Sequence, residues 1–145
     1  MDIQELIRSL GKRLGINDIE MSDAGVCSVV FGEDEVIFEQ EGSLLFIISE
    51  IGSVEGNEKF FRAMLDANHC SHGSGFGSIG IEKERNCFTL SRLIEGDFNI
   101  DLLEKQLQLF VSTLRFWKQY LLNNRSPDDT TSENLLYLSK GLSLA

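Results

Sequence analysis

The chain has 145 residues, of which 42% are hydrophobic and 25% charged, and these values are typical of one globular domain rather than of a disordered or fibrous protein. Thirteen basic residues against 23 acidic ones give a formal net charge of −10, which excludes general electrostatic binding to nucleic acid or to an anionic membrane. We therefore expect neutral or basic partners.

The sequence indicates a cytoplasmic protein. Residues 1–8 contain no basic region followed by an apolar stretch, so no secretory signal is predicted. The longest aliphatic and aromatic run, residues 44–48, is far shorter than the roughly 18 residues that a membrane-spanning helix requires. Cys27, Cys70 and Cys87 are odd in number and widely spaced, which favours buried thiols in a reducing compartment over disulfides.

The N-terminal part predicts one helix followed by three strands. Residues 2–14 carry apolar side chains every three or four positions, as an amphipathic helix does, and Gly15 is expected to end this helix. Residues 26–31, 35–40 and 43–51 are rich in Val, Ile and Phe and are separated by short polar segments that contain glycine. This pattern predicts antiparallel strands linked as hairpins.

A second helix is predicted from a cap at Asn57 to about Asn68. Its apolar residues occupy more than one stripe, whereas a surface helix of a monomer needs only one. We therefore expect this helix to lie between the sheet and another partner, and a second subunit is the simplest candidate. The apolar residues are Phe60, Phe61, Ala63, Met64, Leu65 and Ala67.

Two strands and a long helix complete the predicted domain. The Gly- and Ser-rich residues 70–77 lead to strands expected at 78–82 and 87–94. Residues 99–123 then carry a leucine-rich and aromatic stripe with helical spacing. The resulting order, α-βββ-α-ββ-α, predicts an α+β fold in which helices pack on a twisted antiparallel sheet.

This single domain is expected to cover residues 1–123. Pro127 and the acidic pair after it mark a polar linker, and residues 124–145 are predicted to consist of that linker and an apolar C-terminal tail. The tail can form a short helix or stay mobile, as chain ends often do. Its apolar residues are Leu135, Leu136, Leu138 and Leu142.

Three patterns suggest chemistry, but none meets its structural requirements. Residues 75–80 match GxGxxG, yet they lead from a helix into a strand, which is the reverse of the order in a dinucleotide site. His69, Cys70 and His72 lack the second ligand pair that is usual in a structural zinc site. Adjacent residues at a helix end point apart, so Cys70 and His69 do not form a nucleophile pair. We expect no cofactor, no metal and no enzymatic activity.

Apolar surface is the feature that remains. It is concentrated on the second helix and on the amphipathic first helix, and short antiparallel strands leave at least one sheet edge unpaired. An extended peptide can add a strand to such an edge while its side chains fill alternate pockets. The alternative is that these apolar residues form only the core and a dimer interface.

The order of elements and several segments resemble the CesT/Tir family of class I type III secretion chaperones. The similar segments are residues 6–16, 25–31, 61–68 and 110–121, with a Gly-rich turn between the last two. The resemblance covers roughly residues 1–123. It implies a homodimer, located in a bacterial cytoplasm, that binds the non-globular N-terminal region of a secreted effector. The dimer would keep that region soluble and secretion-competent and deliver it to the secretion apparatus, with the secretion ATPase as a further partner.

The resemblance also implies two sets of site residues. The second helix supplies the dimer interface, with Phe60, Phe61, Met64, Leu65 and Asn68. The first helix and the first two strands supply an apolar groove for the effector, formed by Ile3, Ile7, Leu10, Val29, Phe31, Val36 and Phe38. An alternative function is a regulator with the same fold that sequesters a transcriptional control protein and so couples secretion to gene expression.

Overall fold

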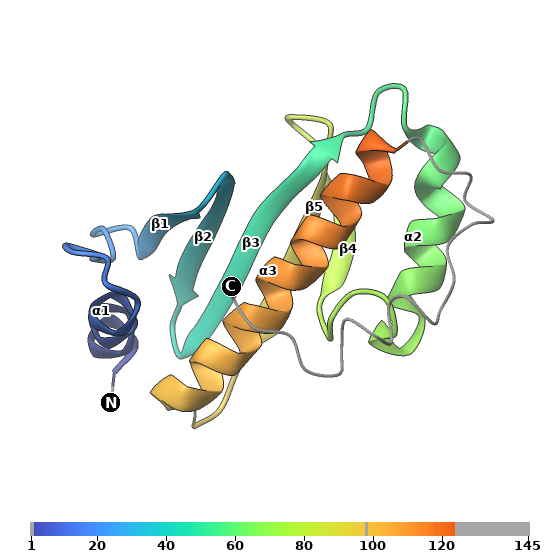
Figure 1. Ribbon diagram of the computed structural model, residues 1–145. Helices are drawn as coiled ribbons and strands as arrows, with labels where there is room; N and C mark the ends of the chain where they lie inside the picture. The colour runs from blue at the N-terminus through green and yellow to red at the C-terminus, as the bar shows by residue number, and fades with distance from the viewer. Residues whose placement is uncertain (1, 98, 124–145) are drawn as a thin grey trace.

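A five-stranded antiparallel sheet carries the α-helices of this protein (Figure 1). The computed structural model describes residues 2–97 and 99–123, so the predicted linker and tail lie outside the described residues. Within those ranges the helices are α1 (Ile3–Leu14), α2 (Phe61–Asn68) and α3 (Ile100–Leu122). The strands are β1 (Val26–Phe31), β2 (Asp34–Glu41), β3 (Leu44–Ser53), β4 (Ser78–Glu82) and β5 (Cys87–Ile94). The predicted α+β order is confirmed.

The sheet order is β1-β2-β3-β5-β4, so β1 and β4 are its edges. β1, β2 and β3 follow one another as hairpins, and α2 connects β3 to β4 at the opposite edge. β5 then returns between β3 and β4, where Ile48 pairs with Ser91 and Ile79 pairs with Leu90. The edges therefore lie four strand spacings apart, which is about 19 Å.

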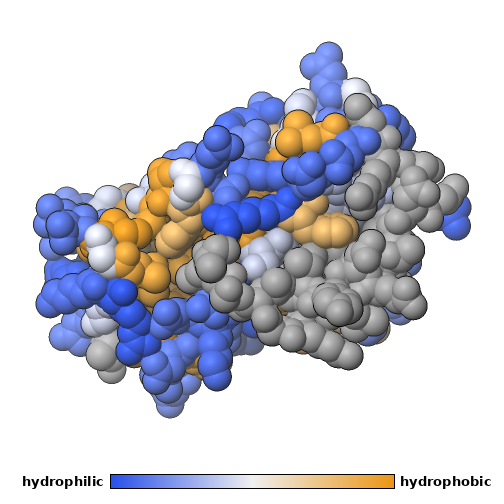
Figure 2. Space-filling model, viewed as in Figure 1, coloured by the Kyte–Doolittle hydropathy of each residue, from blue (hydrophilic) through white to orange (hydrophobic). Residues whose placement is uncertain are grey.

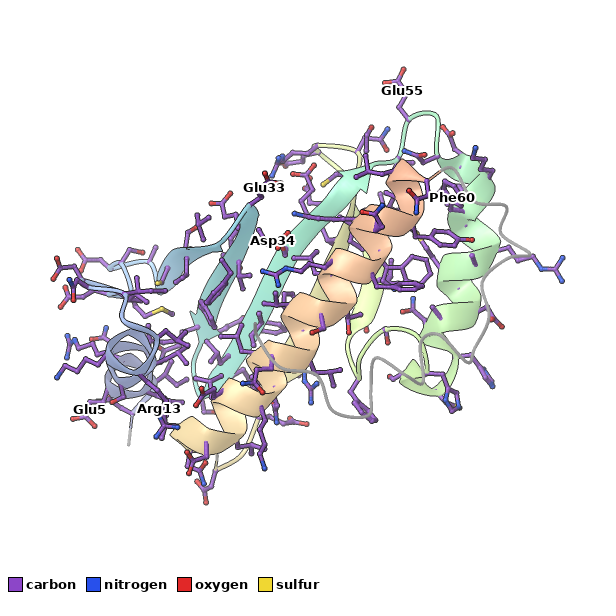
Figure 3. The ribbon with its side chains drawn as sticks, in the orientation of Figure 1. Glu5, Arg13, Glu33, Asp34, Glu55 and Phe60 are labelled. Carbon is purple, nitrogen blue, oxygen red and sulfur yellow. The ribbon has the colours of Figure 1, made fainter. Side chains whose placement is uncertain are left out.

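Capping interactions fix the ends of α1. The Asp2 side chain accepts a hydrogen bond of 2.7 Å from the backbone N–H of Glu5, which satisfies one of the free donors of the first turn. Gly15 ends the helix with φ of 70°, in the left-handed region that glycine adopts without strain. At the last turn Arg13 contacts Asp101 at 2.6 Å and Glu104 at 2.9 Å, which joins α1 to the start of α3 (Figure 3).

The prediction that Asn57 caps the second helix is wrong. Asn57 precedes a short 3₁₀ turn, Glu58–Phe60, and its side chain makes no capping hydrogen bond there. Its amide instead donates to the carbonyl of Ser53 at 2.9 Å and so closes the turn that follows β3. α2 itself begins only at Phe61.

The core lies on one face of the sheet, between the strands and the helices. Every second strand residue points to this face, as the pleat of a strand requires. From α3 the core receives Trp117 and Tyr120, whose rings meet edge to face at 5.1 Å between centroids. The strand residues in the core include Val29, Val36, Phe38, Leu45, Ile47, Phe88, Leu90 and Ile94.

None of the described helices is both long and apolar enough to cross a membrane.

Candidate protein-binding surfaces

Of the five residues predicted for the dimer interface, Phe60 and Met64 are buried, Asn68 is half-buried, and Phe61 and Leu65 are exposed. Phe60 is fully buried and packs edge to face on Tyr120 at 5.1 Å, so it belongs to the core of the protomer (Figure 3). Asn68 holds the backbone of Ile79 with two hydrogen bonds of 2.8 Å and thereby fixes β4 against α2. Phe61 and Leu65 face solvent, with exposures of 38% and 71%.

Phe61 and Leu65 lie beside the edge strand β4 and share an apolar hollow of about 350 Å³ with it. The ring of Phe61 meets that of Phe88 at 5.8 Å and nearly at right angles, which sets the orientation of the exposed side chain. Apolar side chains next to an unpaired strand edge mark a protein interface. We call this surface the α2–β4 patch; it consists of Phe61, Met64, Leu65, Ile79, Ile81 and Phe88.

The structure corrects the predicted effector groove. The resemblance placed its residues in an apolar groove, yet Phe31 alone is half-buried and the others are buried in the core. They point to the face of the sheet that the helices cover, so an effector cannot reach them while the domain is folded. The buried residues are Ile3, Ile7, Leu10, Val29, Val36 and Phe38.

The alternate residues of the same strands form a second apolar surface on the other face of the sheet. Ile37 pairs with Ile48, and Phe46 pairs with Leu93, so apolar side chains lie next to one another across the strands. Val30 is 60% exposed at the β1 end of this surface. We call it the open sheet face; its residues are Val26, Val30, Ile37, Phe46, Ile48 and Leu93, all half-buried or exposed.

Sequence reasoning missed the open sheet face because the signal that identifies it is weak. Val36, Ile37 and Phe38 are consecutive apolar residues, so the alternation that tells one face from the other is lost in β2. β3 has the same ambiguity from Leu44 to Ile48. The pairing register is required to decide which residues point outward.

The edge strand β1 adjoins a further hollow, of about 450 Å³, whose other wall is formed by residues 16–20. Ile16 and Val26 contribute apolar side chains to this hollow. Figure 2 shows apolar surface on the side of the molecule that carries β1 and β2, bordered by hydrophilic side chains. An unpaired edge of this kind is where an extended peptide can add a strand.

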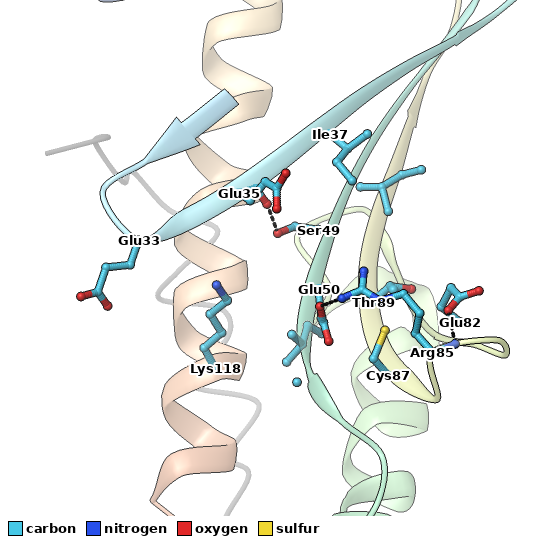
Figure 4. Close-up of a pocket in the computed structure, with 13 residues that line it drawn as sticks. Glu33, Glu35, Ile37, Ser49, Glu50, Glu82, Arg85, Cys87, Thr89 and Lys118 are labelled. Atoms are coloured by element: carbon cyan, nitrogen blue, oxygen red, sulfur yellow. Dashed lines mark hydrogen bonds and ion pairs between the residues drawn. The ribbon is translucent and has the colours of Figure 1, made fainter. Parts of the chain in front are cut away.

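A third hollow, of about 410 Å³, opens where β2 and β3 part (Figure 4). Their pairing begins at Ile37 and Ile48, and before that point the hydroxyl of Ser49 donates to the carbonyl of Glu35 at 2.5 Å. We call this space the acidic hollow. Its lining includes Glu33, Glu35, Ile37, Ile48, Glu50, Glu82, Arg85, Thr89 and Lys118.

Asp34 anchors the β1–β2 hairpin to α3. It accepts 2.8 Å hydrogen bonds from Arg115 Nε and Lys118 Nζ, and its side chain is 9% exposed. Burial acts to raise the pKa of Asp34, but the hydrogen bonds from Lys118 and Arg115 outweigh it and hold the pKa below its ordinary value. Asp34 is therefore a charged structural contact between the sheet and α3.

The sequence patterns that suggest cofactor and metal chemistry occupy ordinary structural positions. Residues 75–80 run from the connection after the short 3₁₀ turn His69–Ser71 into β4, so the helix-to-strand context is confirmed. Trp117 Nε1 donates to the carbonyl of Gly73 at 2.9 Å and anchors this connection to α3. In the part of the chain that the structure describes, no three His, Cys, Asp or Glu side chains are placed to hold a metal ion.

The sequence matches the Tir chaperone protein (CesT) family over residues 5–118, which is most of the chain. The protein belongs to this family, and the family predicted from the sequence is confirmed. No curated protein matches the chain.

Solved structures share the fold at low sequence identity. A chain of the ExsC–ExsE complex matches with a TM-score of 0.72 and 18% identity, over 82% of this chain and 96% of that one. A chain from the complex of the Yersinia pestis type III secretion chaperone SycH with a fragment of YscM2 matches with a TM-score of 0.63 and 19% identity, covering 79% and 98%. A chain of the HopA1–SchA chaperone–effector complex gives 0.66 and 11%, covering 79% and 91%.

Proposed function

We propose that this protein is a type III secretion chaperone that, as a homodimer, binds the non-globular N-terminal region of a secreted effector. It keeps that region soluble and secretion-competent and delivers it to the secretion apparatus, including the secretion ATPase. The open sheet face carries this proposal, because it is an apolar surface that the described helices leave uncovered in a member of a chaperone family. HopA1–SchA is a chaperone–effector complex, which supports the same function here.

The α2–β4 patch is the proposed dimer interface. Leu65 projects from α2, and Ile81 projects from the edge strand beside it, so a second copy can bury both. A symmetric dimer needs one self-complementary surface, and an apolar patch at a sheet edge meets that need. Phe61 and Leu65 thus keep the role predicted for them, whereas Phe60 contributes by supporting α2 from the core.

The proposed dimer leaves both effector surfaces free. The α2–β4 patch lies at one end of the strand order, and the β1 edge lies at the other, about 19 Å away. The open sheet face extends between them on the side opposite the helices. An effector segment can therefore lie across the sheet, pair with β1, or do both, while the two chains remain associated.

The test of this function is capture of the effector from the native cell. The tagged full chain is expected to co-purify with the N-terminal region of a secreted protein. Ile37→Asp places a charge on the open sheet face and should abolish this co-purification while the mass remains twice 16.3 kDa. Leu102→Asp, at an exposed apolar position near the start of α3, is the matched control and should retain the effector.

Two results would contradict the proposal. If Ile37→Asp captures the effector as well as the unchanged chain does, the open sheet face is not the binding surface. If the captured protein is a transcriptional control protein rather than a secreted one, the regulatory function is correct instead.

A further inference from the structure

The acidic hollow lies on the open sheet face and combines two kinds of surface (Figure 4). Ile37 and Ile48 form an apolar part, and they belong equally to the open sheet face. Glu33, Glu35 and Glu50 line the same hollow, where β2 and β3 part. A segment that binds the apolar part must therefore pass close to these carboxylates.

The carboxylates are not all neutralised within the protomer. Glu50 is paired with Arg85 at 2.7 Å. Lys118 also lines the hollow, but its ammonium group contacts Asp34 at 2.8 Å instead. Glu35 accepts a hydrogen bond of 2.7 Å from the uncharged hydroxyl of Ser28.

Glu33 lies at the β1–β2 turn (Figure 3), and its carboxylate forms no ion pair with any described residue. Three of the carboxylates that line the hollow thus lack a cationic partner among the residues that the structure describes: Glu33, Glu35 and Glu82, the last of which accepts backbone N–H groups of Glu84 and Arg85. The net charge of −10 adds to their negative potential.

We propose that the effector segment bound on the open sheet face is amphipathic and basic. Its apolar side chains pack on Ile37 and Ile48, and a neighbouring Lys or Arg pairs with Glu33 and Glu35. This inference rests on the proposed function and specifies the chemistry of its partner. An acidic segment would be repelled, and an uncharged apolar one would leave both carboxylates without a cation.

The spacing between the apolar part and the carboxylates of the acidic hollow suits such a segment. Glu35 and Ile37 are two residues apart on one face of β2, which places them about 7 Å from each other along the strand. A lysine or arginine next to an apolar anchor spans this distance with its flexible side chain, because the stem rests on apolar surface while the charged group reaches outward. The segment can therefore satisfy both parts of the hollow at once.

The test compares three short labelled peptides with the same isoleucine pattern, in which the remaining positions are lysine, glutamine or glutamate. Binding to the full-length dimer is measured by fluorescence anisotropy at low and high salt. The lysine peptide should bind about tenfold more tightly than the glutamine peptide at low salt. The glutamate peptide should bind most weakly. Added salt should reduce the difference, since both carboxylates are exposed.

Two double variants distinguish the effect of the hollow on peptide affinity from the effect of the protein's overall negative charge. Glu33→Gln with Glu35→Gln should bring the lysine peptide to the affinity of the glutamine peptide and leave the glutamine peptide unchanged. Glu55→Gln with Glu58→Gln removes the same charge from the β3–α2 connection and should preserve the preference for lysine.

Three results overturn the inference: equal binding of the lysine and glutamine peptides, an equal effect of both double variants, or no binding of any peptide. The proposed function fails separately, when Ile37→Asp retains the native effector. If the glutamine peptide binds as tightly as the lysine peptide and Ile37→Asp abolishes effector capture, the proposed function stands without the charge preference.

Discussion

Phe38 and Ile37 are neighbours in β2 and point to opposite faces of the sheet. Phe38 is fully buried among the residues of the core, whereas Ile37 is half-buried on the open sheet face. The pleat of the strand makes this difference, because successive side chains alternate between faces. An aspartate substitution is therefore expected to have a different effect on folding at each position.

Phe38→Asp should unfold the domain. It removes an aromatic side chain from the core, which costs about 3–5 kcal/mol, and adds the penalty of a buried, unpaired charge. Val36→Asp should act in the same way, while Ile37→Asp should stay folded. Urea denaturation followed by circular dichroism measures the three free energies of unfolding. A folded Phe38→Asp protein that has lost only its effector would restore the groove predicted from the sequence.

Asp34 makes the stability dependent on pH. Its pKa is lower in the folded state than in the unfolded chain, so its contribution is present above the unfolded pKa of about 3.9. That contribution is lost as the pH falls through the still lower folded value. Asp34→Asn should reduce the free energy of unfolding by about 1–3 kcal/mol at neutral pH. The difference between the two proteins should begin to shrink below about pH 4 and disappear only below the folded pKa.

The matched control for Asp34→Asn is Asp66→Asn, at an exposed carboxylate on α2. It should leave both the stability and its dependence on pH nearly unchanged. A constant difference between Asp34→Asn and the unchanged chain down to pH 2 would show that Asp34 does not act through its charge.

Among the elements, α2 is the one whose exposed side is not explained by the protomer alone. Its inner residues Ala63, Met64 and Ala67 are buried, whereas Phe61 and Leu65 are exposed beside β4. The prediction that apolar residues occupy two sides of this helix is confirmed. The dimer proposed from it depends on the exposed side.

Leu65→Asp should dissociate the dimer without unfolding the domain. Leu65 is 71% exposed, so a charge is tolerated in the protomer but is buried when two copies meet. We expect the dimer dissociation constant to rise about 30-fold or more, as for a residue at the centre of an interface. Light scattering should then give 16.3 kDa at micromolar concentration. Leu102→Asp should stay dimeric, and a dimeric Leu65→Asp would place the interface elsewhere.

The elements could be predicted from the sequence because each has a clear local pattern. β4 and β5 have the predicted bounds, and α3 differs by one residue at each end. The site residues could not be predicted in the same way. A shift of one residue in the pairing register moves each side chain of a strand to the other face of the sheet. Consecutive apolar residues such as Val36, Ile37 and Phe38 do not specify the register. The resemblance placed Phe60 in the dimer interface, and the structure places it in the core, because position along the chain does not tell the core side of this segment from its exposed side.

The whole molecule is strongly acidic, and this should give its two kinds of contact opposite responses to salt. Two chains of charge −10 repel each other, while the α2–β4 patch between them is apolar. Added salt screens the repulsion and should therefore tighten the dimer. Sedimentation at about 0.05 and 0.3 M salt measures this effect. A dimer that weakens with salt would require attractive ion pairs across the interface.

The two edges of the sheet are unlike, and this difference bears on how many copies of the chain can assemble. β4 lies beside exposed apolar residues of α2, whereas β1 lies beside the residues 16–20. When two β4 edges face each other about a twofold axis, assembly stops at two copies. A β1 edge docked on a β4 edge would instead repeat from copy to copy and build a fibre. By occupying β4, the proposed dimer would remove this head-to-tail route and leave each particle with two identical β1 edges for cargo.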